Sequence, residues 1–191
     1  MTQRFSTDVL VIGGGAAGLS AALHLADHAR VTVLCKGGLE SASSHWAQGG
    51  VASVIDPEDS IAAHVNDTLI AGAGLCDEDT VTQTVTGGPR AIAQLGRWGV
   101  DFDATENEFH LTREGGHSVR RILHVADATG KAITETLTAN VLDHPNIDLV
   151  NDRVAIDLIN LNKFGRFPNR CAGAYVLNRT SGHVELFQAR F

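Results

Sequence analysis

The chain has 191 residues, of which 43% are hydrophobic and 19% charged, and its formal net charge is −7 at neutral pH. These values are typical of a globular domain with a sizeable core, exclude an intrinsically disordered chain and disfavour a nucleic-acid partner. No apolar run is long enough to span a membrane. The first residues lack the apolar stretch of a secretory signal, and the three cysteines form no paired motif. We therefore expect a cytoplasmic protein.

The first predicted elements surround a glycine-rich turn. The four apolar residues Val9–Ile12 predict a buried strand, and glycines then follow in the pattern Gly-x-Gly-x-x-Gly. Gly13 allows a sharp turn, Gly15 lets the backbone approach a pyrophosphate, and Gly18 lets the next helix pack closely on the strand. The N–H groups at the start of that helix favour phosphate binding. A turn without a ligand is the alternative, but this context favours a dinucleotide site.

A second strand completes a βαβ unit over residues 8–36. The helix is expected to run to about His28, and Val31–Leu34 forms the strand. An ordinary NAD site has an acidic residue near this point, which binds the ribose. Cys35 and Lys36 stand there instead, so NAD is disfavoured and Lys36 leaves NADP as an alternative.

The middle of the chain combines a small-residue loop with helices. Residues 37–54 are rich in Gly, Ser and Ala, so the backbone there can approach a ligand. A helix is expected over Ser60–Ala71 and another after the N-cap Asp77, which Gly87–Pro89 should break or kink. The apolar positions of the two helices are Ile61, Val65 and Leu69, and Val81, Val85, Ile92 and Leu95.

A long loop is predicted over residues 99–128, because they show little periodicity and many polar groups. An amphipathic helix follows and ends at His144-Pro145, so residues 60–144 form a helical and active-site loop region. Its apolar positions are Ala132, Ile133, Leu137 and Val141.

Residues 147–191 are predicted to form strands. Ile147–Val150 is typical of a third parallel strand, and the rest of an antiparallel meander. The meander strands are expected at Val154–Leu161, Cys171–Asn178 and Val184–Phe191, with turn residues at Asn178–Gly182. We expect the chain to be the front piece of a longer protein.

Four separated motifs resemble those of the L-aspartate oxidases, a branch of the fumarate reductase and succinate dehydrogenase flavoprotein group. They are Ser43–Gly50, Ile70–Gly74, His110–Ser118 with Arg120–His124, and Asp127–Gly130. The resemblance implies an α/β, Rossmann-like FAD-binding domain with a parallel sheet and a small antiparallel meander. Because the family's enzymes are much longer, residues 1–191 are expected to be the N-terminal part of that domain. The capping domain and the helical C-terminal domain are expected to lie outside the chain.

The resemblance also implies an activity, the oxidation of L-aspartate to iminoaspartate by FAD. Oxygen or fumarate then accepts the electrons, and the product passes to quinolinate synthase in NAD biosynthesis. In the family the catalytic arginine lies downstream, so we expect these residues alone to be inactive.

The cofactor residues are assigned by matching the family's motifs. The glycine turn matches the segment that wraps the diphosphate, Lys36 matches the family's residue after the second strand, and Ser43–Gly50 matches the loop beside the ribityl chain and flavin ring. In the fumarate reductase branch a histidine in this loop carries the flavin covalently, but that position is Ser43 here, so non-covalent FAD is expected. The expected cofactor-binding residues are Gly13, Gly14, Gly15, Ala16, Ala17, Gly18, Lys36, Ser43, Ser44, His45, Trp46, Ala47, Gln48, Gly49 and Gly50.

A charged run is the candidate substrate site. Arg113, Arg120 and Arg121 concentrate positive charge, and guanidinium groups can bind carboxylates through two hydrogen bonds. Glu114 could pair with the ammonium group of an amino acid and so separate aspartate from succinate. The resemblance assigns substrate orientation to Glu114. The alternative is that the arginines only pair with surface carboxylates and that Glu114 is solvated.

Three histidines recur every seven residues, at His110, His117 and His124. Because zinc sites on helices use a closer spacing, no metal is expected, and His117 is expected to line the substrate pocket. Three other functions remain open. They are a fumarate reductase or succinate dehydrogenase type flavoprotein, a non-catalytic nucleotide-binding module and an NADP-dependent dehydrogenase.

Overall fold

A computed structural model describes residues 3–106 and 108–191, which fall into two compact units. The first unit combines the chain up to Trp46 with Thr134–Phe191, and the second consists of Ala47–Ile133. The second unit is therefore an insertion into the sequence of the first. None of the helices in the described residues is long and apolar enough to cross a membrane.

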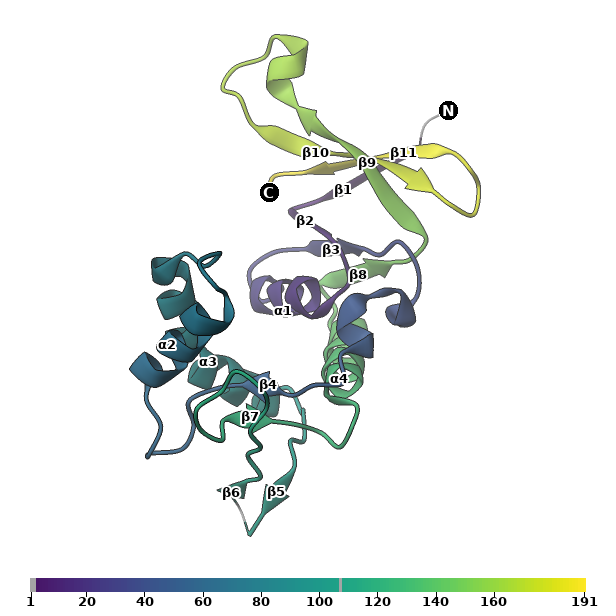
Figure 1. The fold of residues 1–191 in the computed structure, drawn as a ribbon. Helices are drawn as coiled ribbons and strands as arrows, with labels where there is room; N and C mark the ends of the chain where they lie inside the picture. The colour runs from purple at the N-terminus through teal and green to yellow at the C-terminus, as the bar shows by residue number, and fades with distance from the viewer. Residues whose placement is uncertain (1–2, 107) are drawn as a thin grey trace. The chain divides into compact units, whose positions relative to one another are not determined.

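A parallel sheet of three strands lies at the centre of the first unit (Figure 1). Its order is β2 (Val9–Ile12), β3 (Val31–Leu34) and β8 (Ile147–Val150), as the sequence predicts. All four residues of β3 are buried because β3 is the central strand. Helix α1 (Ala16–Leu25) connects β2 to β3 and ends short of the expected His28, in a turn closed by the His28 N–H on the Leu25 carbonyl.

The antiparallel meander packs beside this sheet in the same unit. It consists of β9 (Arg153–Asn160), β10 (Cys171–Asn178) and β11 (Val184–Ala189), which confirms the predicted strands. A 3-10 turn at Leu161–Phe164 follows β9. A strand that the sequence analysis missed, β1 (Arg4–Thr7), pairs in parallel with β11 at the edge.

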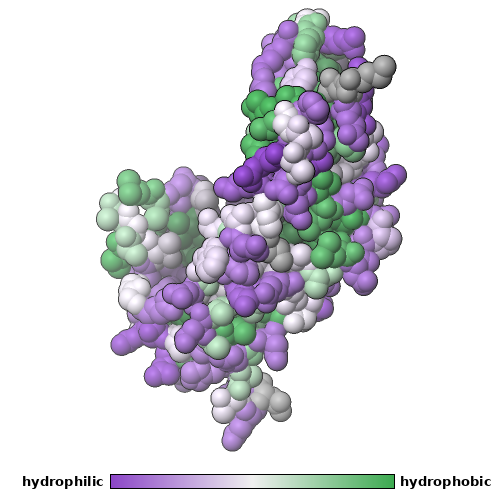
Figure 2. All heavy atoms as spheres, turned by 90° about the vertical axis from the view of Figure 1, so that its right-hand side faces the viewer, coloured by the Kyte–Doolittle hydropathy of each residue, from purple (hydrophilic) through white to green (hydrophobic). Residues whose placement is uncertain are grey.

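Aromatic and aliphatic side chains join the two sheets of the first unit. Phe187 of β11 and Leu34 of β3 are buried in one cluster, and the rings of Phe5 and Phe187 stack with centroids 4.5 Å apart. Apolar side chains also reach the surface, since Ile156 and Leu158 of β9 are about half exposed. Figure 2 shows such apolar groups, in green, among the polar surface of this unit.

Two helices and two small strand pairs make the second unit. Helix α2 (Ile61–Ala71) lies within the expected range and is capped by Ser60, and α3 (Glu78–Arg97) is capped by Asp77 as predicted. The pairs are β4 (Val51–Ala52) with β7 (Ile122–Leu123), and β5 (Ala104–Thr105) with β6 (Glu108–Phe109). Helix α4 (Thr129–Asp143) begins in this unit and continues into the first; Ile133, Leu137 and Val141 are buried along it as predicted.

Three expectations for the second unit need correction. The break that Gly87–Pro89 could have caused does not occur, since α3 is helical from Glu78 to Arg97 with Pro89 inside it, and the kink stays a prediction. The long loop over 99–128 contains β5, β6 and β7, whose two-residue strands are too short to produce a periodic pattern.

The third correction concerns the buried face of α2. The predicted apolar positions Ile61, Val65 and Leu69 are only partly buried, whereas His64 and Asp67 are buried. These two polar residues face a buried arginine, so the face of α2 that packs inward is not the one that its apolar residues mark.

Candidate functional site

The glycine turn has the backbone geometry that its sequence predicts. Gly13 has a φ of +119°, which favours glycine, and its N–H donates to the Leu34 carbonyl of β3. A Cβ at Gly18 would overlap the carbonyl oxygen of Gly13 and would lie 3.2 Å from Cγ1 of Val11. Only glycine therefore allows α1 to begin this close to β2.

The start of α1 is open to an anion. Its N-cap is Gly15, which provides no side-chain cap, and the first turn contains no acidic residue. The N–H of Ala16 donates to Oγ of Ser44 at 3.3 Å, and this bond connects the expected flavin loop Ser43–Gly50 to the glycine turn. Positive helix-dipole charge and backbone N–H groups thus gather where the diphosphate is expected.

A cavity of about 630 Å³ in the first unit joins this turn to the strand ends. Predicted residues from both segments line it, namely Gly13, Gly14, Gly15, Lys36, Ser43 and Ser44. Further lining residues, not predicted from the sequence, belong to α4, β8, β9 and the link between the two strands: Thr138, Leu142, Leu149, Asn151, Arg153, Val154 and Ala155. A wall with both apolar and polar groups suits a dinucleotide, which combines a flat base with sugars and phosphates.

Polar atoms in the cavity wall fit a polar ligand. Oγ1 of Thr138 is buried and has no hydrogen-bond partner among the described residues. Arg153 is held by the buried Glu185, whose Oε2 accepts from its Nε at 2.6 Å. A Cβ at Gly14 would overlap Sγ of Cys35, so the backbone fits closely against the wall. An unsatisfied hydroxyl and a small-residue wall are features that a nucleotide cofactor would use.

The side chains of His45 and Trp46 have partners within the first unit. Indole Nε1 of Trp46 donates to the Glu40 carbonyl at 2.7 Å, and Nδ1 of His45 lies 3.3 Å from Oγ1 of Thr134. These contacts fix the 3-10 turn Ser43–Trp46. The loop is therefore an ordered segment with defined contacts rather than a plain Gly/Ser connector.

The predicted residues Ala47, Gln48, Gly49 and Gly50 belong to the second unit, where the Ala47 carbonyl accepts from the Gly130 N–H. Glu114 belongs to the same unit. A Cβ at Gly49 would lie 3.7 Å from Oε2 of Glu114, so the carboxylate stands directly beside the loop backbone. The structure thus brings the expected substrate residue to the expected flavin loop.

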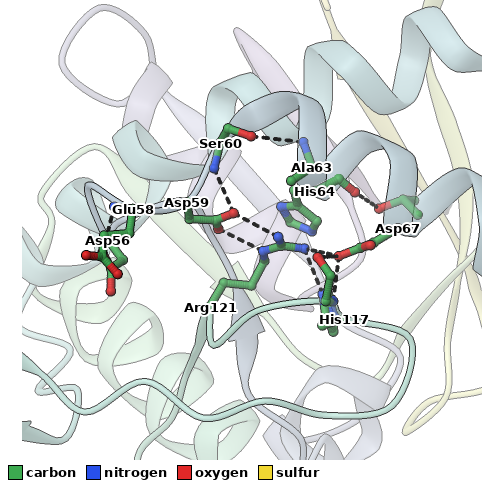
Figure 3. A network of polar contacts seen from close by, with 11 residues as sticks. Asp56, Glu58, Asp59, Ser60, Ala63, His64, Asp67, His117 and Arg121 are labelled. Carbon is green, nitrogen blue, oxygen red and sulfur yellow. Dashed lines mark hydrogen bonds and ion pairs between the residues drawn. The ribbon is translucent and has the colours of Figure 1, made fainter.

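The three arginines of the charged run separate into two groups. Arg113 and Arg120 are exposed and, with Thr112 and Val119, line an open hollow of about 580 Å³. Arg121 is fully buried, and its guanidinium bonds Asp59 and Asp67 (Figure 3). Arg121 therefore has its carboxylate partners inside the protein, which corrects the interpretation that all three arginines bind ligand carboxylates.

The geometry around Arg121 is close to ideal for ion pairs. Its Nε and Nη2 donate to the two oxygens of Asp59, both at 2.8 Å, and its Nη1 donates to Oδ2 of Asp67 at 2.6 Å. The same Oδ2 accepts from the N–H and the hydroxyl of Ser118, each at 2.8 Å. Nη1 of Arg121 also lies 3.3 Å from Nδ1 of His117, which must accept because a guanidinium only donates.

These contacts shift the pKa values of the carboxyl groups. The Ser118 N–H, helped by the Ser118 hydroxyl and by Arg121 and opposed by burial, lowers the pKa of Asp67 to about 2. Burial raises the pKa of Asp59, but the hydrogen bonds from Arg121 and Ser60 outweigh it and lower the pKa. Burial, with the charge of Arg121, lowers the pKa of His64, so this histidine is held neutral.

We expect the stability of the second unit to fall in acid because of Asp67. A carboxyl whose pKa drops from 3.8 to about 2 on folding adds stability above pH 3.8, and this is lost as the pH falls toward about 2. Urea unfolding at stepped pH values from about pH 5 downward should show this loss. The Asp67→Asn variant should show a shallower slope. Parallel slopes for the two proteins would contradict this explanation.

The three regularly spaced histidines do not form one cluster, since His110 and His124 contact each other and His117 contacts other residues. Nδ1 of His110 is 3.1 Å from Nε2 of His124, whose Nδ1 lies 3.0 Å from Oδ2 of Asp103. His117 instead contacts Arg121 and the ring of His64. The expected role of His117 in lining the substrate pocket stays a prediction.

L-aspartate oxidases are among the known proteins to which this chain is similar. L-aspartate oxidase of Pseudomonas aeruginosa is 55% identical over the whole chain, which covers 37% of that protein, and the Vibrio cholerae enzyme is 50% identical over 96% of the chain, which covers 36% of it. The chain thus spans little more than a third of the length of these relatives.

Solved structures agree with the fold. The match with E. coli quinol fumarate reductase covers 98% of this chain and 32% of the reductase chain, with a TM-score of 0.89 and 27% sequence identity. The match with the Mycobacterium smegmatis Sdh1 complex covers 98% of this chain and 34% of the matched chain, with a TM-score of 0.85 and 27% sequence identity. A family model described as an FAD binding domain matches residues 8–191. The chain therefore belongs to the FAD binding domain family, and its cofactor is FAD.

Proposed function

We propose that the complete protein oxidises L-aspartate to iminoaspartate. The substrate loses a hydride from Cα and a proton from its nitrogen, and its C–N bond becomes a C=N bond. FAD, when bound, accepts the hydride and is reoxidised by oxygen or fumarate. The identity of about one half to L-aspartate oxidases along nearly the whole chain supports this proposal.

The residues of the first unit would hold the cofactor. The N–H groups at the start of α1 face the diphosphate, and Gly13–Gly18 keep the backbone close enough for them to donate. Lys36, Ser43 and Ser44 line the same cavity. Because Ser43 occupies the position where the fumarate reductase branch has its flavin-linked histidine, FAD is held without a covalent bond.

Glu114 determines the substrate specificity. Its carboxylate lies beside Gly49 of the flavin loop, and this is the observation on which the proposal mainly depends. There it pairs with the ammonium group of aspartate, which succinate and fumarate lack. The exposed Arg113 and Arg120 raise the local concentration of a dicarboxylate in an otherwise acidic chain.

The replacement Glu114→Gln tests this role in the complete protein. Because it removes the charge and keeps the shape, kcat/KM for aspartate should fall at least about tenfold, while kcat/KM for fumarate reduction should change little. Steady-state assays with both substrates provide the comparison.

A matched control is Glu108→Gln, which removes an exposed carboxylate from the same unit and should leave both reactions unchanged. Equal losses of the aspartate and fumarate reactions in Glu114→Gln would refute the proposed pairing with the ammonium group.

A fumarate reductase or succinate dehydrogenase type activity is the weaker alternative. The structures of that kind are 27% identical, and both Ser43 and Glu114 favour the amino-acid oxidase. Aspartate oxidation would take place in the cytoplasm, where iminoaspartate passes to quinolinate synthase as a step in NAD biosynthesis.

A further inference from the structure

The loop that carries Glu114 is closed at its base, and within it His117 and Ser118 contact residues of α2. Thr112 and Ile122 exchange two backbone hydrogen bonds of 3.0 Å, which close the loop between them. Within it, a turn brings the His117 N–H to the Glu114 carbonyl at 3.3 Å, and Gly116 has a φ of +87°. Glu114 is therefore the first residue of the turn 114–117, and Ser118 follows directly on its far side.

Asp67 of α2 holds that far side. Its Oδ2 accepts from the Ser118 N–H and from the Ser118 hydroxyl, each at 2.8 Å, and from Nη1 of Arg121. A single carboxylate oxygen thus connects the helix, the loop and the buried guanidinium. Figure 3 shows Asp59 and Asp67 on opposite sides of Arg121.

The charges of this network indicate why a second carboxylate is present. Asp59 already bonds Arg121 through both of its oxygens and neutralises it. Adding Asp67 leaves one excess negative charge in a cluster where the side chains of Arg121 and Asp59 are 0% and 2% exposed. Buried excess charge is costly unless hydrogen bonds offset it, and two of the three donors to Asp67 belong to Ser118. Neutralising Arg121 does not require Asp67, whereas fixing Ser118 does.

We propose that Asp67 and Ser118 are positioning residues for Glu114: they fix the turn 114–118 on α2 and so hold the Glu114 carboxylate beside Gly49. This inference rests on the proposed role of Glu114 and identifies residues of that same site that determine specificity. Neither residue contacts the substrate. Their loss should displace a charge that must meet an ammonium group within hydrogen-bond distance, and small displacements of such groups are expensive.

The decisive variants in the complete protein are Ser118→Ala and Ser118→Thr. Alanine removes one donor to Asp67, whereas threonine keeps the hydroxyl. In Ser118→Ala we expect the ratio of kcat/KM for aspartate to kcat/KM for fumarate to fall about tenfold, mainly through a higher KM for aspartate. Ser118→Thr should restore the ratio to within about twofold of the original. Asp67→Asn should act in the same direction as Ser118→Ala.

Two controls separate positioning from stability and from the proposed function itself. Ser60→Ala removes the N-cap of α2, which should cost about 1 kcal/mol of stability, and should leave the ratio unchanged. In the Glu114→Gln background, Ser118→Ala should lower the ratio no further, because both changes act through one carboxylate.

Each outcome decides between the two proposals. If Glu114→Gln itself leaves the ratio unchanged, the proposed function fails. If Glu114→Gln lowers the ratio but Ser118→Ala does not, or if Ser118→Ala lowers both reactions equally, the positioning role is overturned.

Discussion

Replacing Gly18 by alanine is expected to abolish FAD retention by the complete protein and to destabilise the first unit by about 1–3 kcal/mol. The new methyl group would overlap the carbonyl oxygen of Gly13 and lie 3.2 Å from Cγ1 of Val11. Because the overlapping atom belongs to the backbone, α1 must move away from β2, and its first N–H groups move with it. We expect the Kd for FAD to rise by more than tenfold, where tenfold corresponds to a loss of about 1.4 kcal/mol of binding free energy.

Flavin fluorescence titration and thermal unfolding measure the two effects. The matched control is Gly96→Ala in α3, where a Cβ would meet nothing within 4 Å. Replacing glycine by alanine at such an open helical position should raise the free energy of unfolding by about 0.5–1 kcal/mol. If Gly18→Ala bound FAD as tightly as Gly96→Ala, the close contact between α1 and β2 would not be required for the phosphate site.

Replacing Arg121 by methionine is expected to cost about 3–5 kcal/mol of the free energy of unfolding. Methionine fills much of the space but leaves Asp59 and Asp67 buried without a cation between them. The carboxyl groups would then lose the bonds of 2.6 to 2.8 Å that offset their burial. Adding Asp59→Asn and Asp67→Asn to the same protein should recover much of the loss, because no unpaired buried charge remains.

Urea unfolding of these proteins provides the comparison, and Lys163→Met is the matched control. Lys163 pairs with Asp157 at 2.7 Å, but both side chains are more than half exposed, so its removal should change stability by less than about 1 kcal/mol. A cost for Arg121→Met no greater than that for Lys163→Met would contradict the assignment of Arg121 as a structural residue.

Local sequence predicted the elements whose geometry is decided locally. The turn between β2 and α1 follows from Gly13 and Gly18, since few other residues can adopt that backbone or allow that approach. Asp77 begins α3 as the expected N-cap, because its side chain accepts from an N–H three residues ahead, and α2 begins where a helix was expected, with Ser60 as its cap. Helix α4 follows from its apolar spacing.

Contacts between distant residues were not predictable in the same way. Strand β1 pairs with β11 across nearly the whole chain, and Arg4–Thr7 contains only one large apolar residue. The buried polar face of α2 depends on Arg121, which lies 54 residues beyond Asp67. No periodic pattern reports such a pairing, since Asp and Arg usually mark an exposed face. The same long-range network separates Arg121 from Arg113 and Arg120, which look equivalent in the sequence.

Anaerobic mixing of the FAD-loaded complete protein with L-aspartate is the decisive test of aspartate oxidation. We expect the oxidised-flavin absorbance to disappear with aspartate, and to do so much more slowly in Glu114→Gln. Succinate, which lacks the ammonium group, should reduce the flavin poorly. A flavin that succinate reduces as fast as aspartate does, or that aspartate does not reduce, would contradict the proposed function.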